Sequence, residues 1–219
     1  MASSIGRLYV GTSGFSYPSW RDGFYPSGTK PDELLRYYAS RLPSVEINST
    51  FYQLPSEATF ERWAAATPDG FRFAVKMNRR IAQFGNLTLA GTFCERVRVL
   101  EERLGPVRVV LARARDDGWL RLLLDSLEPK LSVAFDVRHS SWAGAQLHGE
   151  HSVRVGALGG AAPFRYLRFR EPPYGEKDLA ALAETIRPLL AGGIDVYAYF
   201  RHEEAPTAPA YAERLLALI

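Results

Sequence analysis

The sequence contains a single cysteine, Cys94, among its 219 residues. One cysteine excludes an internal disulfide and any metal site built from several thiolates, and it is typical of a reducing compartment. No apolar run approaches the length of about 18 residues that a membrane-spanning helix needs. The N-terminal segment MASSIGRLYVG lacks the apolar core of a secretory signal peptide. These absences predict a cytoplasmic protein without a membrane partner.

Lysine and histidine are also scarce, with four residues of each type. The other basic side chains are arginines, whose planar guanidinium suits phosphate and carboxylate groups. The 27 lysines and arginines are nearly balanced by 24 acidic residues, and the formal net charge is only +3. This balance does not indicate a strong nucleic-acid binder. The four lysines are Lys30, Lys76, Lys130 and Lys177.

The arrangement of the apolar residues indicates the fold class. They make up 47% of the chain, enough to bury one sizeable core. Segments with apolar residues at every second position alternate with segments at helical spacing, which is typical of β/α units around a parallel sheet. Eight such strands close a barrel. The predicted strands are 7–13, 44–50, 72–78, 107–112, 131–138, 153–158, 165–169 and 195–201.

Helices are predicted between most of these strands, but not in every connection. One helical pattern runs through residues 93–104 and ends at Gly105-Pro106, whereas residues 139–152 and 159–163 show no helical pattern. We therefore predict one α/β domain over residues 1–219. Its fold is a compact TIM-type (β/α)₈ barrel in which one or two helices are missing or shortened between strands 5 and 7.

Polar residues form rows on one side of several predicted strands. Because successive side chains point to opposite faces of a strand, the apolar residues should face the helices and the polar residues the barrel axis. Burying a carboxylate such as that of Glu46 is costly unless it is paired, and Lys76 and several arginines are the expected partners. The inward rows are Glu46 and Asn48, Lys76 and Asn78, Asp136 and Arg138, Arg168 and Arg170, and Tyr197, Tyr199 and Arg201.

These inward charges have two interpretations. One is a satisfied salt-bridge network without chemistry, although stability explains many buried charges poorly. The other is a site at the C-terminal rim, where (β/α)₈ enzymes place their catalytic groups. In that hypothesis Glu46 is a general acid or base, Asn48 belongs to the same catalytic group, and Lys76 stabilises negative charge or forms a Schiff base. The predicted substrate-binding residues at strand ends are Asn78, Arg138, His139, Arg168, Arg170 and Tyr199.

Aromatic residues gather in the loops that follow the strands. The segment GFSYPSWRDGFYP alone carries five rings in a short polar stretch. Rings beside arginines suit a sugar or a base that carries a phosphate, through stacking and charge-assisted hydrogen bonds. The alternative is a lid that packs on itself, which is equally supported for Phe15 and Phe24. Stacking on the substrate is predicted for Tyr17, Trp20, Tyr52 and Trp142.

Metal binding is the weaker hypothesis for this site. Oxygen and nitrogen ligands suit Mn or Zn, but no HxH or HExxH spacing is present, and neighbouring basic side chains oppose a cation. The chain also lacks a GxSxG elbow, a P-loop and a GxGxxG after a strand. We therefore expect no metal and no cofactor. The residues that could surround a divalent ion are Glu46, Asp136, His139 and His202.

Five sequence blocks resemble a known family. They are GTSGFSYPSWRDGFYP, VEINSTFYQLPS, FRFAVKMNRRI, FDVRHSSW and VYAYF, and they follow one another over most of the chain. These blocks are similar to those of the YecE-like proteins, the domain of unknown function number 72. The resemblance implies a TIM barrel. It implies no catalytic residues, because the family has no settled activity.

Together, the residues and the resemblance predict a YecE-like TIM-barrel protein that acts without a metal on an anionic substrate at the rim of the barrel. The substrate is expected to be a phosphate-bearing sugar or a compound derived from nucleic acid. Two alternatives stay open: a non-catalytic protein that binds nucleic acid, and a metal-dependent phosphodiesterase similar to endonuclease-IV-like barrels. The sequence leaves the oligomeric state open.

Overall fold

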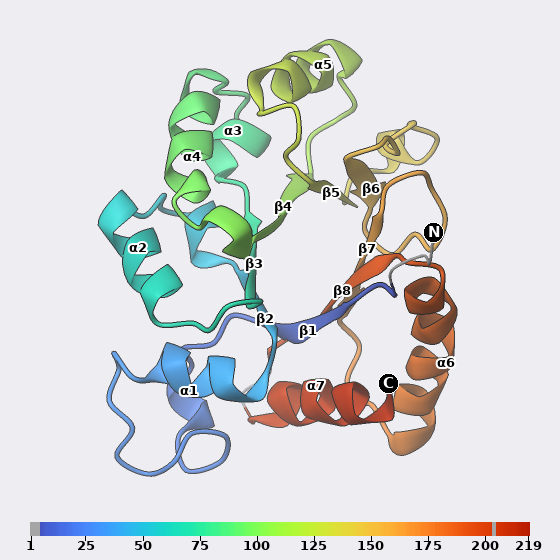
Figure 1. Ribbon diagram of the computed structural model, residues 1–219. Helices are drawn as coiled ribbons and strands as arrows, with labels where there is room; N and C mark the ends of the chain where they lie inside the picture. Colours follow the sequence, from blue (N-terminus) through green and yellow to red (C-terminus); the bar gives the residue numbers. More distant parts are fainter. Residues whose placement is uncertain (1–4, 203–204) are drawn as a thin grey trace.

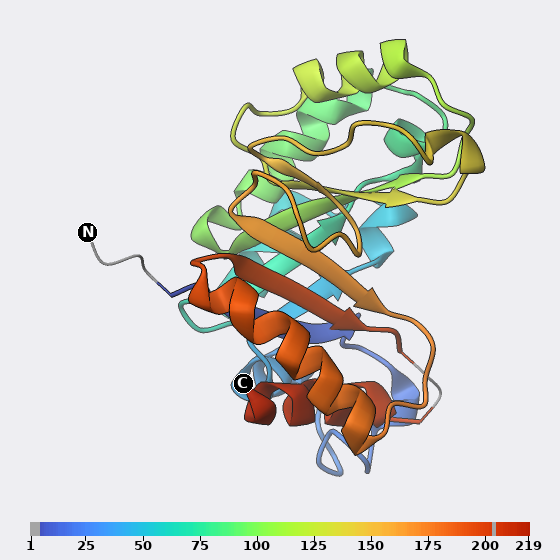
Figure 2. The same cartoon turned by 90° about the vertical axis from the view of Figure 1, so that its right-hand side faces the viewer.

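The computed structural model describes residues 5–202 and 205–219, so the first four residues of the N-terminal segment lie outside the described part. Eight parallel strands form one sheet in the order β6-β5-β4-β3-β2-β1-β8-β7. Helices surround this sheet, as Figure 1 and Figure 2 show from two directions. The strands are β1 (Leu8–Ser13), β2 (Ser44–Ile47), β3 (Arg72–Lys76), β4 (Leu104–Leu111), β5 (Val133–Val137), β6 (Ser152–Arg154), β7 (Phe164–Phe169) and β8 (Asp195–Phe200). The helices are α1 (Leu34–Arg41), α2 (Glu57–Ala65), α3 (Arg79–Ala82), α4 (Thr88–Arg98), α5 (Asp117–Ser126), α6 (Glu176–Ala191) and α7 (Thr207–Leu218).

The predicted TIM-type (β/α)₈ barrel is confirmed, with one gap in its wall. The sheet has its edges at β6 and β7, and between them the Gly156 amide donates a hydrogen bond of 2.8 Å to the Tyr166 carbonyl oxygen. From 139 to 163 the chain forms β6 and the short 3-10 turn Ser140–Trp142, but no α-helix. Loops occupy this side of the barrel (Figure 1). The helices predicted to be missing between strands 5 and 7 are therefore missing.

The predicted boundary between the third helix and the fourth strand is wrong. The helix α4 ends at Arg98, and β4 begins at Leu104 instead of 107. The register between β3 and β4 shifts between Phe73 and Val75, and this irregularity lies opposite Gly105-Pro106. A bulge tolerates a proline, which has no amide hydrogen to donate to a neighbouring strand.

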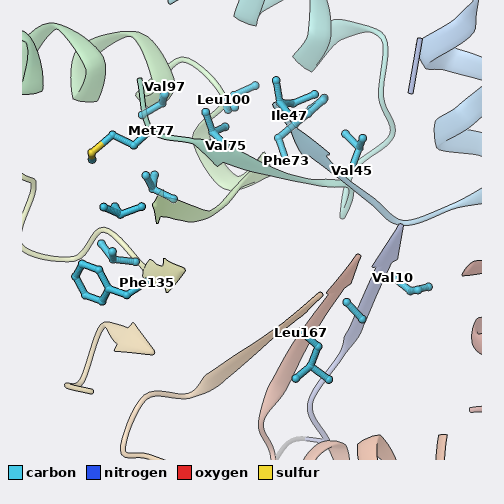
Figure 3. Packing of buried hydrophobic residues seen from close by; sticks show 14 of the residues in the cluster. Val10, Val45, Ile47, Phe73, Val75, Met77, Val97, Leu100, Phe135 and Leu167 are labelled. Atoms are coloured by element: carbon cyan, nitrogen blue, oxygen red, sulfur yellow. The ribbon is translucent and has the colours of Figure 1, made fainter. Parts of the chain in front are cut away.

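Two cores lie on the two sides of the sheet. The outer core fills the space between strands and helices, where Ile47 and Val75 lie with Val97 of α4 (Figure 3). The inner core fills the barrel itself, which is therefore packed and not a pore. The predicted alternation of outward apolar and inward polar residues is confirmed for the strand ends. The inner cluster consists of Tyr9, Ala74, Ala134, Val153, Ala162, Phe164, Tyr166, Tyr197 and Tyr199.

Two expectations from the composition concern the single cysteine and membrane-spanning helices. Cys94 lies on α4 and is buried in the outer core, so its role there is packing. Among the described residues, no helix combines the length and the apolar character needed to cross a membrane.

Candidate functional site

The site is built around Glu46, the third residue of the short buried strand β2. Its neighbours Val45 and Ile47 pack in the outer core, so the Glu46 carboxylate points into the barrel. The side chain is fully buried. Four donors surround it: Arg108 Nη1 at 3.0 Å, Asn48 Nδ2 at 3.0 Å and Arg168 Nη2 at 2.9 Å from Oε1, and the Tyr166 hydroxyl at 2.7 Å from Oε2.

A second buried carboxylate, Asp136 of β5, is held in the same way by three arginines. Arg108 donates to Asp136 Oδ2 through Nε at 3.0 Å and Nη2 at 2.6 Å. Arg170 Nη2 lies 2.8 Å from the same oxygen, and Arg138 Nε lies 3.1 Å from Oδ1. Arg108 therefore bridges the two carboxylates and is itself 3% exposed.

Both carboxylates are held in the ionised form. Burial alone raises the pKa of Glu46, but Arg108, Arg168 and the donors of Tyr166 and Asn48 outweigh it, so the pKa lies below its ordinary value. For Asp136, burial again raises the pKa, and the surrounding arginines again bring it below the usual range. A buried carboxylate whose oxygens already accept several hydrogen bonds is poorly placed to take a proton from a substrate. The geometry therefore does not support the general acid or base role expected for Glu46.

Above these carboxylates, the C-terminal ends of the strands form a basin of about 480 Å³. Six of its lining residues are cationic, whereas Glu46 and Asp136 lie beneath it. Within the described part of the chain, four positive charges thus stay uncompensated at the basin. Its lining residues are Ser13, Tyr17, Asn48, Ser49, Tyr52, Lys76, Arg108, Arg138, Arg168, Arg170, Arg201 and His202.

Two of these arginines have a buried N–H donor without a hydrogen-bond partner among the described residues. The buried Nε atoms of Arg168 and Arg170 have no hydrogen-bond partner among residues 5–202 and 205–219. The side chain of Arg168 is only 8% exposed. An unpaired buried donor is costly, so both guanidinium groups are held with part of their hydrogen-bonding capacity unused.

Lys76, the last residue of β3, lies beside Arg108 in the β3–β4 register. Its ammonium nitrogen is 3.6 Å from the centre of the Phe51 ring, and no carboxylate of the described chain lies within ion-pair distance of it. Burial lowers the pKa of Lys76 to about 8; Arg108 and Arg168 act in the same direction, and Glu46 and Asp136 oppose them. The expected ion pair between Lys76 and Glu46 is therefore absent.

Two other residues that line the basin, Tyr17 and His202, form a stacked pair. Their ring centres are 4.4 Å apart at an interplanar angle of 13°. The Tyr17 hydroxyl donates to the Ser13 carbonyl oxygen at 2.5 Å, and the His202 amide donates to the Ser13 hydroxyl at 3.0 Å. Burial lowers the pKa of His202, with help from Arg201 and Arg168, so this imidazole is neutral near pH 7.

Two of the predicted stacking residues do not reach the basin. Trp20 is fully buried and packs edge to face with Phe24, so the aromatic loop after β1 packs on itself. Trp142 is also fully buried, and its indole N–H donates to the Arg113 carbonyl oxygen at 2.9 Å. In both positions a nearby apolar cluster takes the ring that was expected to contact substrate. Tyr52, by contrast, is 67% exposed at the rim.

Three other predicted binding residues have structural contacts instead. Tyr199 is buried in the inner core, where its hydroxyl lies 2.6 Å from the Ser44 hydroxyl. Asn78 caps α3 by accepting a hydrogen bond from the Arg80 amide at 3.0 Å. His139 caps the 3-10 turn after β5. None of the three lines the basin, so their predicted contact with substrate is not supported.

Sequence reasoning missed two central residues, although a signal for both was present. Arg108 alternates with Val107 and Val109, which pack in the outer core, so the period-two rule places its side chain inside the barrel. Tyr166 lies on the same face of β7 as Arg168 by the same rule. The predicted inward rows include Arg168 but neither Arg108 nor Tyr166.

A second hollow, of about 570 Å³, adjoins the basin and shares Arg168 and Arg170 with it. Its opposite wall is partly apolar and includes Pro173, Tyr174 and Leu182 near the start of α6. Together the two hollows leave room for a ligand larger than an isolated anion.

The described residues contain no group of three or more histidine, cysteine, aspartate or glutamate side chains arranged to hold a metal ion. Of the four residues that the sequence suggested for such a site, Glu46 and Asp136 are joined to arginines, and His139 caps a turn.

Comparison with known proteins places the chain in a family. A family model described as "Protein of unknown function DUF72" matches residues 9–219. The chain belongs to this family. The resemblance to the YecE-like proteins is thereby confirmed.

The chain is also similar to individual proteins. The UPF0759 protein YunF of Bacillus subtilis is 33% identical over 69 residues, a match that spans 32% of this chain and only 23% of that protein. The DUF72 family protein TM1631 of Thermotoga maritima matches with a TM-score of 0.81 at 23% identity, covering 97% of this chain and 98% of that one. The Enterococcus faecalis DUF72 protein EF0366 matches with a TM-score of 0.75 at 17% identity, covering 97% of each chain. At these identities the solved structures show a shared fold.

Proposed function

We propose that this DUF72 protein is an enzyme that binds a phosphate-bearing small molecule in the basin at the C-terminal rim of its barrel. The observation that carries the proposal is the excess of cationic side chains that line the basin. Guanidinium groups recognise phosphate oxygens through charge-assisted hydrogen bonds. A phosphate dianion would offset half of the uncompensated charge and accept hydrogen bonds from guanidinium groups that line the basin.

The residues around the basin then have distinct roles. Glu46 and Asp136 fix the guanidinium groups of Arg108, Arg168 and Arg170, and fixed donors stabilise a developing charge better than mobile ones. Arg138 and Arg201 add positive charge to the lining of the basin. Lys76, with its pKa near 8, is the group best suited to exchange a proton at neutral pH. Tyr17 and Tyr52 offer rings to the non-anionic part of the ligand.

The proposed chemistry has no obligatory metal. A divalent ion at Glu46 or Asp136 would displace guanidinium donors that already occupy the carboxylate oxygens. It would also add charge to a basin in which cations already predominate, and this is unfavourable at short range.

Thermal unfolding in the presence of small anions tests the proposal directly. The panel contains inorganic phosphate, sugar phosphates, nucleotides and short oligonucleotides, each at low and moderate salt. A ligand at a hundred times its dissociation constant adds about 2.7 kcal/mol, which raises the unfolding temperature of a domain of this size by roughly 5 to 10 °C. Arg201→Met should reduce the shift. Arg36→Met, which removes an exposed arginine of α1, is the matched control and should preserve it.

The outcomes separate the competing functions. Stabilisation by a small phosphorylated compound, reduced in Arg201→Met and kept in Arg36→Met, supports the proposal. If oligonucleotides alone stabilise the protein and their effect falls steeply with salt, the barrel rim binds nucleic acid and the proposal is wrong. Equal behaviour of the two variants would place the anion outside the basin and would also contradict it.

A further inference from the structure

Lys76 is the single lysine that lines the basin, and its surroundings differ from those of the other three lysines. Its ammonium nitrogen lies over the Phe51 ring, with Arg108 next to it in the sheet. Lys30, Lys130 and Lys177 are exposed to solvent. The basin thus presents one half-buried amine among guanidinium groups, at the place where the proposed phosphate site would hold a ligand.

This environment increases the fraction of neutral amine, the form that acts as a nucleophile. Charged groups face Lys76 from four strands: Glu46 on β2, Arg108 on β4, Asp136 on β5 and Arg168 on β7. Burial and the two arginines favour loss of the proton, and the two carboxylates oppose it. The Phe51 ring face also favours the ammonium form, but a contact of this kind is weak beside several neighbouring charges.

We infer that Lys76 forms an imine with the carbonyl carbon of a phosphate-bearing aldehyde or ketone held in the basin. This inference rests on the proposed function, because the same arginines that bind the phosphate bring the carbonyl group to the amine. Binding the substrate beside the nucleophile replaces a bimolecular encounter by a reaction within one complex. The negative charge of the phosphate also offsets the positive charge of a protonated imine among the arginines.

The covalent step needs no oxidant or reductant. The amine nitrogen attacks the carbonyl carbon and a C–N bond forms, while the electron pair of the C=O π bond moves to oxygen, which receives a proton. The C–O bond then breaks and oxygen leaves as water. Overall, the two protons of the amine leave with the carbonyl oxygen, and a C=N bond joins the Lys76 nitrogen to the substrate carbon.

Reductive trapping with pyridoxal 5′-phosphate, a phosphate-bearing aldehyde used here as a probe, tests the inference. Borohydride converts any imine to a stable secondary amine, and peptide mass mapping locates it. We expect Lys76 to be labelled several-fold more than Lys30, Lys130 and Lys177, and inorganic phosphate to suppress labelling at Lys76 alone. Pyridoxal, which lacks the phosphate, should label Lys76 without this preference.

Three variants test whether the labelling depends on Lys76 and on an arginine of the basin. Lys76→Arg keeps the positive charge and should remove the preferential labelling. No other lysine should then be labelled in preference to the rest. Arg201→Met should reduce labelling at Lys76 towards the level of the exposed lysines, and Arg36→Met should leave it unchanged. Circular dichroism spectra of the variants verify that each is folded.

Equal labelling of all four lysines, or a Lys76 that stays unlabelled, overturns the inference. The thermal shift with inorganic phosphate then distinguishes failure of the imine at Lys76 from failure of the anion site. If phosphate still stabilises the protein while Lys76 is unlabelled, the imine is wrong and the anion site stands. If phosphate neither stabilises the protein nor protects Lys76, the proposed function fails as well.

Discussion

Arg108 Nη1 lies 3.0 Å from Glu46 Oε1, and the other edge of the same guanidinium contacts Asp136. One buried arginine on β4 therefore joins carboxylates from β2 and β5. The strands β2, β3, β4 and β5 are consecutive in the sheet, so the bridge reaches across β3 on one side and to the adjacent β5 on the other. It fixes the position of the Arg108 guanidinium group, and Arg108 is one of the residues that line the basin.

Replacing Arg108 should be strongly destabilising. Arg108→Met leaves two buried carboxylates without their shared partner, and breaking a buried ion pair in this way costs about 3 to 5 kcal/mol. Urea unfolding followed by circular dichroism at pH 7 measures the loss. The control is Arg98→Met, because Arg98 pairs with Glu128 on the surface, where an exposed pair contributes at most about 1 kcal/mol. Similar losses in the two variants would show that the buried bridge contributes no more to stability than an exposed ion pair.

The hydroxyl of Tyr166 should contribute separately to the same layer. Tyr166→Phe keeps the ring in the inner core and removes the donor to Glu46 Oε2, with an expected loss of about 1.5 to 3 kcal/mol for a hydrogen bond to a charged group. Tyr52→Phe at the exposed rim is the matched control, expected within about 0.5 kcal/mol of the wild type. A loss in Tyr166→Phe no larger than in the control would mean that water or another donor replaces the hydroxyl.

The period-two pattern was sufficient to predict the strands and the side of each strand that carries charge. Glu46, Asp136 and Arg168 all lie inside the barrel because their neighbours are apolar, and this is a local property that the sequence contains. Arg108 obeys the same rule, although the predicted inward rows do not include it. The site's location at the C-terminal rim remains a prediction, supported by the position of the basin.

The pairing of these charges could not be predicted from the sequence. Which arginine reaches Glu46 depends on barrel closure and register, and these set distances between strands far apart in the chain. Trp20 and Trp142 illustrate a second limit. Whether a loop aromatic faces a ligand or packs inward depends on the space left by other loops, and residue spacing contains no information about that space.

The contribution of Glu46 to stability should depend on pH. Since the folded-state pKa of Glu46 lies below its ordinary value of 4.5, its contribution is fully present above that pH and is lost as the pH falls through the folded-state pKa. The free energy of unfolding of Glu46→Gln should therefore lie about 3 kcal/mol below that of the wild type near pH 7, with a difference that shrinks below pH 4.5. Glu184→Gln, at an exposed position of α6, should show a small difference at every pH. A difference between wild type and Glu46→Gln that does not change with pH would argue against an ionised Glu46.

Lys76 should have the opposite effect on stability, because its pKa is lowered on folding. With a folded-state pKa of about 8 against 10.5 for the ordinary group, the unfolded chain binds more protons between these values, so stability rises with pH across that window. Below pH 8 the folded protein holds an ammonium group beside Arg108 and Arg168, and this is unfavourable. Lys76→Met removes the charge, so we expect the variant to be more stable than the wild type at pH 7.

The pH dependence of that gain is the informative quantity, because a methionine beside Phe51 also adds a contribution from packing that does not change with pH. Urea unfolding at intervals from pH 7 to 10.5 should show the gain of Lys76→Met decreasing as the wild-type amine loses its proton. Lys130→Met, at an exposed position, should give a difference that stays flat over the same range. A constant gain in Lys76→Met would mean that the amine has an ordinary pKa, and the neutral nucleophile at the basin would lose its support. A gain that decreases with pH would show that the fold maintains an unfavourable charge where the proposed chemistry needs a reactive amine.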